Sequence, residues 1–486
     1  MKRFISLALL LALICTSCGS AGSTDDTTSG ADTPADETGT TAPETEPDRL
    51  SELGEKDFGG RKFTILDAND HPDMHVNIPE DEQNGDILND ALFERNSFVA
   101  DRYNLKFDYV TGMNGAEGMK SLKQNVLAGD DTYTLAIAPL LGGAIGSVAL
   151  DGVLYDLASN EYLSLDQNWW SRLLYDSLRL DGKMYYTTGD ISPSIYQMPA
   201  CLFLNTRLAE DYGIDTNELC DLVRDGKWTL DEMIRINKDK YVDTNANNKM
   251  DTEDTYGFVH HNPSQLQTDC FFTTAGVNLS TIDGSKLSVD IVNERTLGVI
   301  EKLRELIVDI KYSDDNGLID TTYKEGHALM LYHYVESASQ RFRDMKDDFL
   351  ILPMPKYDEA QDDYHSFVNT WVDAFVAIPT TADPEFAGFV TEALAYWSYQ
   401  NIREKAYDVT YKTKTSRDDN SADMLDIIFD TLYIDFSCIY DFGGLSTALT
   451  KVLKGKAELA GAIAPIESKI DGEIEKFETN WINGVS

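Results

Sequence analysis

The sequence predicts an α/β protein with more than one lobe. Apolar residues make up 42% of the 486 residues, which is enough to form sizeable hydrophobic cores. At about 100 to 200 residues per domain, a chain of this length is expected to form two or three lobes. Short apolar strands also alternate with amphipathic helices, a pattern typical of mostly parallel sheets that helices cover on both faces.

The chain is strongly acidic. It holds 41 Lys and Arg against 83 Asp and Glu, so its formal net charge is −42. Proteins that bind nucleic acids or anionic membrane surfaces neutralise phosphates with rows of basic side chains. The charge therefore excludes nucleic acid as a partner.

The N-terminus has the features of a lipoprotein leader. Lys2 and Arg3 precede an apolar run, residues 4–15, whose 12 residues are too few to span a bilayer and are typical of a signal peptide. Small residues come directly before Cys18, and this arrangement resembles the lipobox of bacterial lipoproteins. We expect residues 1–17 to be cleaved and Cys18 to hold the protein at the outer side of the cell membrane; ordinary secretion is the alternative.

A tether is predicted between the leader and the folded body. Residues 19–48 consist only of Gly, Ser, Thr, Ala, Pro, Asp and Glu, a composition that cannot bury enough apolar surface to fold. We therefore expect residues 18–48 to be a disordered acidic tether. Without the two leader bases and the eight tether acids, residues 49–486 carry 39 bases and 75 acids, a charge of about −36, so the acidity belongs to the body itself.

Patterns along the body predict its strands and helices. The first part is expected to contain strands at 62–67, 105–110 and 134–139, with helices that begin after Asp86 and at Ala116. Later helices are expected to begin after the N-cap residues Thr229, Asn293 and Asp383, the second of them with an apolar stripe that includes Leu297. Strands are expected at 349–352 and 374–378, and mainly helices in the last 80 residues.

Short motifs follow one another along the body. They are Glu82-x-Asn84-Gly85-Asp86-x-x-Asn89-Asp90-Ala91, Ala128-Gly129-Asp130-Asp131-x-Tyr133, Phe203-Leu204-Asn205, Lys227-Trp228-Thr229 and Ile351-Leu352-Pro353-x-Pro355-Lys356-Tyr357. Together with the leader and the tether, their order resembles extracellular solute-binding lipoproteins of bacterial ABC importers, of the carbohydrate type and family 1-like. The resemblance covers most of residues 60–440.

This resemblance implies a two-lobed fold like that of class II periplasmic binding proteins, with a hinge and an interlobe cleft. Lobe 1 is expected to hold residues 49–198 and 367–405, and lobe 2 residues 199–366 and 406–486. The implied function is capture of a sugar or oligosaccharide and its delivery to the permease subunits of an ABC transporter. The membrane would be contacted only through the lipid anchor.

A sugar site needs flat aromatic rings for stacking and carboxylates or amides for hydrogen bonds to hydroxyl groups. The candidate ligand-binding residues lie near the expected crossings or beyond strand ends, and they are Trp371, Tyr196, Asp190, Asp70, Asn84, Trp170, Tyr332 and Asp373. Trp170 adjoins Trp169, and two adjacent side chains of a helix cannot both face the core, so one of them is expected to be exposed or to lie at the cleft. Any one of these aromatic residues could instead belong to the core.

One loop has the oxygen spacing of an EF-hand calcium site. Side chains of Asp243, Asn245, Asn247, Asp251 and Asp254, with the carbonyl of Lys249, could supply hard oxygen ligands to a structural Ca²⁺. Position 6 of the loop is Asn248 instead of Gly, and position 12 is Asp254 instead of the longer Glu. Asn tolerates a left-handed backbone, so the first departure is mild. The alternative is a polar turn without a metal.

Four cysteines lie in the body and leave two interpretations open. Cys201, Cys220, Cys270 and Cys438 could form one or two disulfides outside the cytoplasm or remain as buried free thiols. No CxxC pair occurs, which argues against a structural zinc site. The loop histidines, His71 with His75 and His260 with His261, are expected to be solvated.

Motifs of common enzymes are absent from the sequence. It contains no HExxH, GxSxG or P-loop motif, so we predict a binding protein with no catalytic residues. Two alternatives stay open. A secreted carbohydrate-active enzyme could place two of the many carboxylates at glycosidase spacing, and a surface adhesin could bind glycans without a transporter.

Overall fold

The computed structural model describes residues 48–71, 77–142, 144–309, 311–312, 318–411 and 419–484. Contacts divide the chain into two units, residues 1–47 and 48–486, and the following concerns the second. The predicted signal peptide, Cys18 and all of the tether except Asp48 lie outside the described residues.

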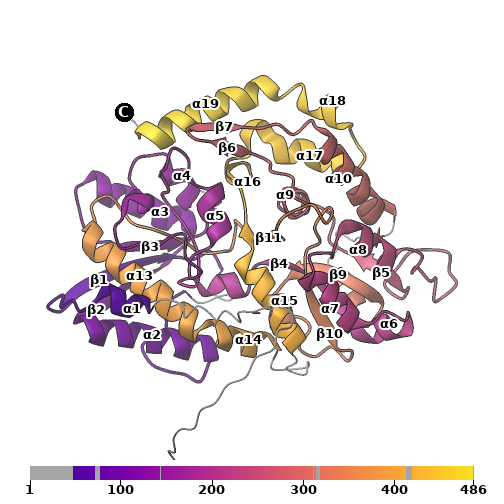
Figure 1. Cartoon of the computed structure of the whole chain (residues 1–486), viewed down its shortest axis with the longest axis horizontal. Coiled ribbons are helices and arrows are strands. Elements are labelled where there is room, and N and C mark those ends of the chain that lie inside the picture. Colours follow the sequence, from indigo (N-terminus) through magenta and orange to yellow (C-terminus); the bar gives the residue numbers. More distant parts are fainter. Residues whose placement is uncertain are drawn as a thin grey trace, which may run out of the picture. The chain divides into compact units, whose positions relative to one another are not determined.

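The first sheet joins strands from distant parts of the chain (Figure 1). Its order is β12-β3-β1-β2, made by β1 (Arg61–Ala68), β2 (Leu105–Met113), β3 (Leu135–Ala138) and β12 (Phe375–Ala377). β1 is parallel to both β2 and β3, whereas β12 pairs with β3 in the antiparallel direction. All four strands were predicted, and the sheet is mostly parallel as expected.

Three helices pack beside this sheet. α2 (Ile87–Tyr103) contacts β2, α3 (Gly115–Leu127) contacts β1, and α13 (Pro384–Asn401) packs against α2. The predicted N-cap residues are confirmed, because the Asp86 and Asp383 side chains accept hydrogen bonds from backbone N–H groups of the first turns of α2 and α13. Asn114 and Glu117 form a capping box at α3.

The second sheet is mixed. Its order is β10-β4-β9-β5-β8, made by β4 (Ala200–Asn205), β5 (Tyr256–Val259), β8 (Lys311–Tyr312), β9 (Ala328–Tyr334) and β10 (Phe349–Pro353). β4 is antiparallel to β9 and β10, whereas β5 is parallel to β8 and β9. The expectation of mostly parallel pairing is wrong for β4. This strand enters from the first sheet and not through a crossover helix of its own sheet, so the crossover rule does not set its direction.

The remaining elements are short or lie near the C-terminus. The helices are α1 (Arg49–Leu53), α4 (Ile145–Ala149), α5 (Arg172–Ser177), α6 (Thr206–Asp211), α7 (Thr216–Arg224), α8 (Leu230–Asn237), α9 (Gln265–Thr274), α10 (Glu294–Arg304), α11 (Ile319–Lys324), α12 (Ser337–Gln340), α14 (Arg403–Tyr411), α15 (Asp419–Asp430), α16 (Phe436–Tyr440), α17 (Leu445–Leu453), α18 (Leu459–Ile463) and α19 (Glu467–Asn483). The strands β6 (Thr281–Asp283) and β7 (Lys286–Ser288) form a hairpin, and β11 (Ser366–Phe367) pairs with β13 (Leu432–Tyr433).

The described part of the last 80 residues is mainly helical, as predicted, and α17 to α19 lie along one side of Figure 1 beside the β6-β7 hairpin. α10 also begins after its predicted cap, Asn293. Its apolar stripe was assigned incorrectly at one position, because Leu297 is 52% exposed while Val299, Ile300 and Leu303 face the core.

The four body cysteines are buried free thiols. This finding decides between the two interpretations that the spacing left open, in favour of core thiols over disulfides. None of the described helices combines the length and the apolar character that crossing a membrane requires.

Candidate ligand-binding site

Trp371 presents an indole ring to solvent at the carboxyl edge of the first sheet. Its loop is fixed to the segment after β3, because the amides of Leu140 and Leu141 donate to the Thr370 carbonyl oxygen at 3.1 and 3.0 Å. One side of the ring lies against Gly142, where an added Cβ atom would be 3.2 Å from the indole Cζ3. The Trp371 side chain is nevertheless 51% exposed. The ring is therefore held in place and open on its other side.

Asp70 lies at the same edge, just after β1. Its Oδ2 accepts a hydrogen bond of 3.0 Å from the Gly115 amide in the first turn of α3. Gly115 also lies against Ala144, two residues after the Gly142 that supports Trp371. Ligands of open α/β sheets bind beyond the carboxyl ends of the strands, and here that edge carries both a carboxylate and an exposed indole.

A second group of predicted residues surrounds a cavity of about 480 Å³. Trp170 and Asp190 line it from the first part of the chain, and Arg403, Asp430 and residues 431–432 line it from the last part. The cavity thus lies where segments distant in sequence meet.

Asp190 is the anchor of this second group. Arg403 donates to it through Nε to Oδ1 at 3.2 Å and Nη2 to Oδ2 at 3.3 Å, and the Tyr196 hydroxyl donates to Oδ1. Burial raises the pKa of Asp190, and Arg403 and Tyr196 only partly oppose that shift. Because its oxygens are already bonded within the protein, Asp190 and Tyr196 hold the segments together, and a ligand role for either stays a prediction.

The two adjacent tryptophans are both buried, so neither is exposed. Trp170 lines the second cavity, and a position at the ligand cleft stays a prediction. Trp169 and Trp170 are each 2% exposed and donate through Nε1 to the two oxygens of Glu392, at 3.1 and 2.8 Å. They do not lie on a helix, since α5 begins only at Arg172. The segment turns so that both indoles reach one carboxylate.

Asp373 and Tyr332 are also buried. Burial raises the pKa of Asp373 to about 8, and the Asn369 amide donates to its Oδ2 at 2.9 Å. The Tyr332 ring packs against Phe271 with centroids 5.1 Å apart.

Asn84 has a local structural role at the start of α2. Its side-chain oxygen accepts a hydrogen bond from the Asp86 amide at 2.8 Å, and its own amide donates to Asp90 at 2.9 Å. The residue is exposed. These bonds shape the turn before the helix, and contact with a ligand stays a prediction.

The loop from Asp243 to Asp254 has the backbone expected at its sixth position, since Asn248 is left-handed with φ of 60°. The two Asp243 oxygens accept hydrogen bonds from the Asn247 and Asn248 amides at 3.2 and 2.8 Å. Asn245 and Asn247 both donate to Asp251. The carboxylate oxygens of Asp243 and Asp251 thus accept hydrogen bonds from other residues of the same loop. The calcium assignment stays a prediction.

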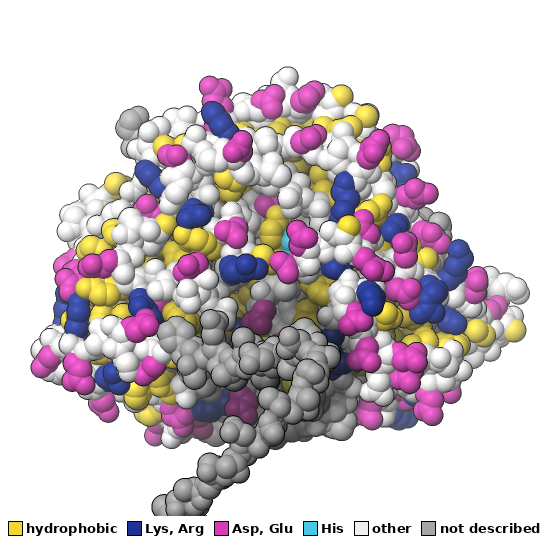
Figure 2. Space-filling model, in the orientation of Figure 1, with side chains coloured by type: hydrophobic (Ala, Val, Ile, Leu, Met, Phe, Trp, Pro, Cys, Tyr) yellow, Lys and Arg dark blue, Asp and Glu magenta, His cyan; other side chains and the backbone are white. Residues whose placement is uncertain are grey.

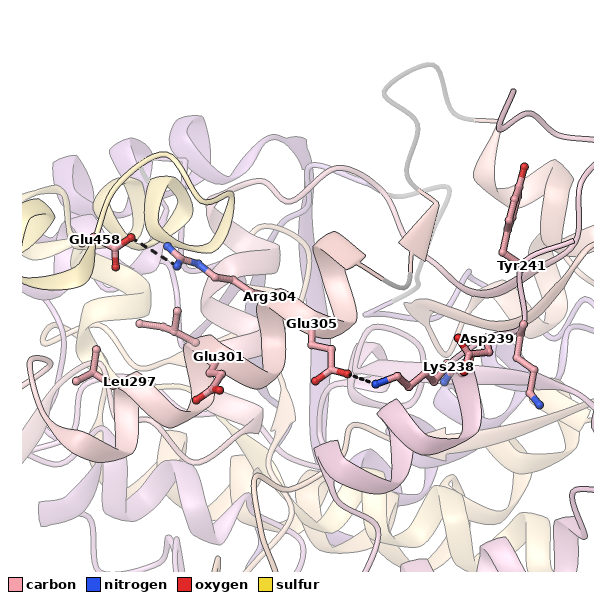
Figure 3. Close-up of a pocket in the computed structure, with 11 residues that line it drawn as sticks. Lys238, Asp239, Tyr241, Leu297, Glu301, Arg304, Glu305 and Glu458 are labelled. Carbon is pink, nitrogen blue, oxygen red and sulfur yellow. Dashed lines mark hydrogen bonds and ion pairs between the residues drawn. The ribbon is translucent and has the colours of Figure 1, made fainter. Parts of the chain in front are cut away.

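Another cavity (Figure 3) was not found by sequence reasoning. It has a volume of about 800 Å³ and lies beside α8 and α10. Lys238 pairs with Glu305 at 3.0 Å, and Arg304 with Glu458 at 3.8 Å. Leu297, the residue misassigned to the core, is part of its lining. With few apolar rings and many paired charges, this cavity is a weaker candidate for binding a sugar.

The expectation of solvated histidines is wrong at His260, whereas His261 is partly exposed. His260 is fully buried against Phe258, and His261 lies 3.1 Å from Asp320 through its Nε2. His71 is exposed as expected, whereas His75 lies outside the described residues. The available sequence signal was that His261 and His333 each lie at the end of an apolar strand.

Comparison with known proteins gives the fold. No family model matches the sequence, and no curated protein matches it either. Among solved structures, the cyclic α-maltosyl-1,6-maltose binding protein from Arthrobacter globiformis is similar, with 12% identity over 86% of this chain and 100% of that chain and a TM-score of 0.54.

Two further structures show the range of ligands. The galacto-N-biose/lacto-N-biose I-binding protein of the ABC transporter from Bifidobacterium longum, in complex with lacto-N-biose, has 13% identity over 87% of this chain and 99% of that chain, with a TM-score of 0.53. UgpB from Mycobacterium tuberculosis, in complex with glycerophosphocholine, has 14% identity over 86% and 99% of the two chains and a TM-score of 0.52. The chain therefore has the two-lobed fold of periplasmic binding proteins that the sequence predicted.

Proposed function

We propose that this protein captures a sugar or oligosaccharide in the cleft between its two lobes and delivers it to the permease of an ABC importer. The observation that carries the proposal is the exposed Trp371 indole, held at the carboxyl edge of the first sheet, where Asp70 also lies. A half-exposed, fixed ring is what stacking on the C–H face of a sugar requires.

The charge of the body supports a neutral ligand. Residues 49–486 carry about −36, and acidic side chains outnumber basic ones over the visible face in Figure 2. Such a surface disfavours approach of an anion. Proteins of this fold bind sugars in two of the three structures compared and glycerophosphocholine in the third, so the fold alone does not choose the ligand.

A thermal-shift screen of the full chain against neutral oligosaccharides, glycerophosphocholine and short peptides tests the proposal. A ligand that binds only the folded state raises the melting temperature. We expect the shift to come from an oligosaccharide, with no release of reducing sugar from that compound. Release of reducing sugar would instead indicate the carbohydrate-active enzyme.

The proposal includes a lipid anchor at Cys18, supported by the leader and tether sequences. Cys18→Ser should release the protein from membranes into the medium, whereas Cys220→Ser, which changes a buried thiol of the body, should not. An unchanged membrane fraction for Cys18→Ser would show that Cys18 is not the anchor, and ordinary secretion or another anchor would then be the explanation.

Copurification with two permease proteins would favour an importer over a surface adhesin.

We also propose that the loop from Asp243 to Asp254 binds a structural Ca²⁺. Five side-chain oxygen donors and the Lys249 carbonyl have the spacing that calcium requires. The left-handed Asn248 allows the loop to fold around the ion although the usual Gly is missing. The ion would stabilise the loop just before β5.

A further inference from the structure

Two histidines and one aspartate meet at one edge of the second sheet. His261 follows β5, His333 lies in β9 and Asp320 lies in the first turn of α11. β5 and β9 are parallel neighbours, so their carboxyl ends lie at the same edge. One nitrogen from each histidine and one oxygen of Asp320 all lie within 4.8 Å of one another, and no other group of His, Cys, Asp or Glu in the described part of the chain does so.

The distances between these atoms are close to those around a tetrahedral metal ion. His261 Nε2 is 3.1 Å and His333 Nε2 is 3.6 Å from the same Asp320 Oδ1. Bonds of about 2.0 to 2.1 Å from Zn²⁺ to nitrogen or oxygen place two tetrahedral ligands about 3.3 Å apart. The two observed distances lie on either side of that value. The two histidine nitrogens lie within 4.8 Å of each other, so the imidazole rings would close on the ion as it binds.

A second layer of side chains supports His333. Its Nδ1 lies 2.6 Å from Ser337 Oγ, and that hydroxyl donates to Glu336 Oε1 at 3.1 Å. A histidine that binds a metal commonly donates a hydrogen bond from its other ring N–H to a nearby oxygen. The Tyr334 amide also lies 2.9 Å from Nδ1, so without a metal this nitrogen is an acceptor. Metal binding at Nε2 requires the proton on Nδ1, from which the Ser337 hydroxyl oxygen can accept a hydrogen bond, while the Tyr334 amide would turn away from a nitrogen that no longer accepts.

Charge and access also favour a cation. Asp320 and Glu336 face one basic side chain, Arg341, which lies 3.0 Å from Asp320 Oδ2 and 3.7 Å from Glu336 Oε1. Arg341 thus occupies the Asp320 oxygen that the histidines do not approach. The His261 side chain is 29% exposed and that of Asp320 21%, so an ion can enter from solvent.

We propose that His261 Nε2, His333 Nε2 and Asp320 Oδ1 bind one divalent transition-metal ion of the Zn²⁺ class, with water in a fourth position. Imidazole ligands favour such ions over Ca²⁺ and Mg²⁺. The site is separate from the oxygen-rich loop before β5 and does not depend on the proposed sugar. It would join the ends of β5 and β9 to the start of α11.

Titration of the full chain with Zn²⁺ tests the proposal, using protein purified without a histidine tag and freed of metal with a chelator. We expect one ion per chain, and Co²⁺ in its place should give the visible absorption of a tetrahedral complex. His261→Gln and Asp320→Asn should each weaken binding at least tenfold. His71→Gln changes an exposed histidine outside the group and should have no effect. Circular dichroism would verify that each variant is folded.

Two results would overturn the proposal. The first is the absence of stoichiometric binding to the wild-type chain. The second is equal Zn²⁺ affinity in the wild type, His261→Gln and Asp320→Asn, which would leave the three side chains as a network of hydrogen bonds and ion pairs with Arg341.

Discussion

At the scale of single residues, exposure separates the tryptophan proposed to bind the ligand from those that build the core. Trp371 is 51% exposed, whereas Trp481 is fully buried and packs edge-on against Tyr185 with ring centroids 4.8 Å apart. Both are large aromatic residues in a sequence with 6 Trp, so residue type alone could not distinguish them. Only the packing of the neighbouring segments does.

The first prediction compares the stability of these two sites. Trp371→Ala removes a ring that the protein covers on one side only, so the free energy of unfolding should fall by about 1 kcal/mol. Trp481→Ala opens a cavity in the core and should cost about 3 to 5 kcal/mol. Urea unfolding of both variants measures the difference, and a cost above about 2 kcal/mol for Trp371→Ala would show that it belongs to the core.

The second prediction concerns the dependence of stability on pH. Burial raises the pKa of Asp373 to about 8, from an ordinary value of 3.8. Between these values the folded chain holds a proton that the unfolded chain has lost, so stability falls as pH rises from about 4 to about 8. Asp67 and Asp435, with pKa values raised by burial to about 6, contribute in the same direction over a narrower range.

Asp373→Asn removes the largest of these three contributions. The wild type should melt at a higher temperature at pH 5 than at pH 8, and the variant should show a smaller difference. Melting curves across that range measure both. A variant whose pH dependence equals that of the wild type would contradict the assignment of a buried, protonated Asp373.

At the scale of elements, the ion pair between Asp190 and Arg403 joins segments more than 200 positions apart, at the edge of the second cavity. Asp190 is 1% exposed. Arg403→Met should destabilise the protein by about 3 to 5 kcal/mol, because it leaves a buried carboxylate without its cation. The double variant with Asp190→Asn should recover much of that loss, as denaturant unfolding would show. Equal losses for the single and double variants would rule out the buried charge as the cause.

The loop before β5 gives a prediction about metal removal. A chelator should lower the melting temperature of the wild type, and added Ca²⁺ should restore it, since an ion bound only by the folded loop stabilises that state. Asp243→Ala should abolish the response, while Asp239→Ala, which changes an acid outside the loop, should keep it. Identical melting curves with chelator and with Ca²⁺ would contradict the calcium proposal.

Helices and strands differ in how well the sequence predicted them. α2 and α13 could be predicted because a cap residue and an apolar stripe are local properties of the chain. The pairing direction of β4 and the meeting of His261 with His333 could not, since both depend on how distant segments approach each other. Trp170 lines the second cavity, and its role in ligand binding stays a prediction. The helix assumed for its segment is wrong, because α5 begins only at Arg172.

At the scale of the whole molecule, the chain forms two sheets with separate strand orders. In the proposed function they would provide the two faces of a closing cleft. β12 returns to the first sheet after the chain has built the second, so the chain crosses between the sheets more than once. Several crossings allow rotation of one lobe against the other without unfolding either, which is the usual hinge mechanism of binding proteins. The Trp371 loop lies just before β12, and closure would bring a ligand on this ring toward the second sheet.

Calorimetric titration of the full chain with neutral oligosaccharides, beside glycerophosphocholine, tests the central claim most directly. The account predicts that a neutral oligosaccharide binds with one site per chain and that Trp371→Ala weakens it at least tenfold, corresponding to about 1.4 kcal/mol or more. Trp397→Ala, which changes a partly buried ring of α13, should keep the wild-type affinity. Binding of glycerophosphocholine alone, or an oligosaccharide affinity that Trp371→Ala leaves unchanged, would contradict it.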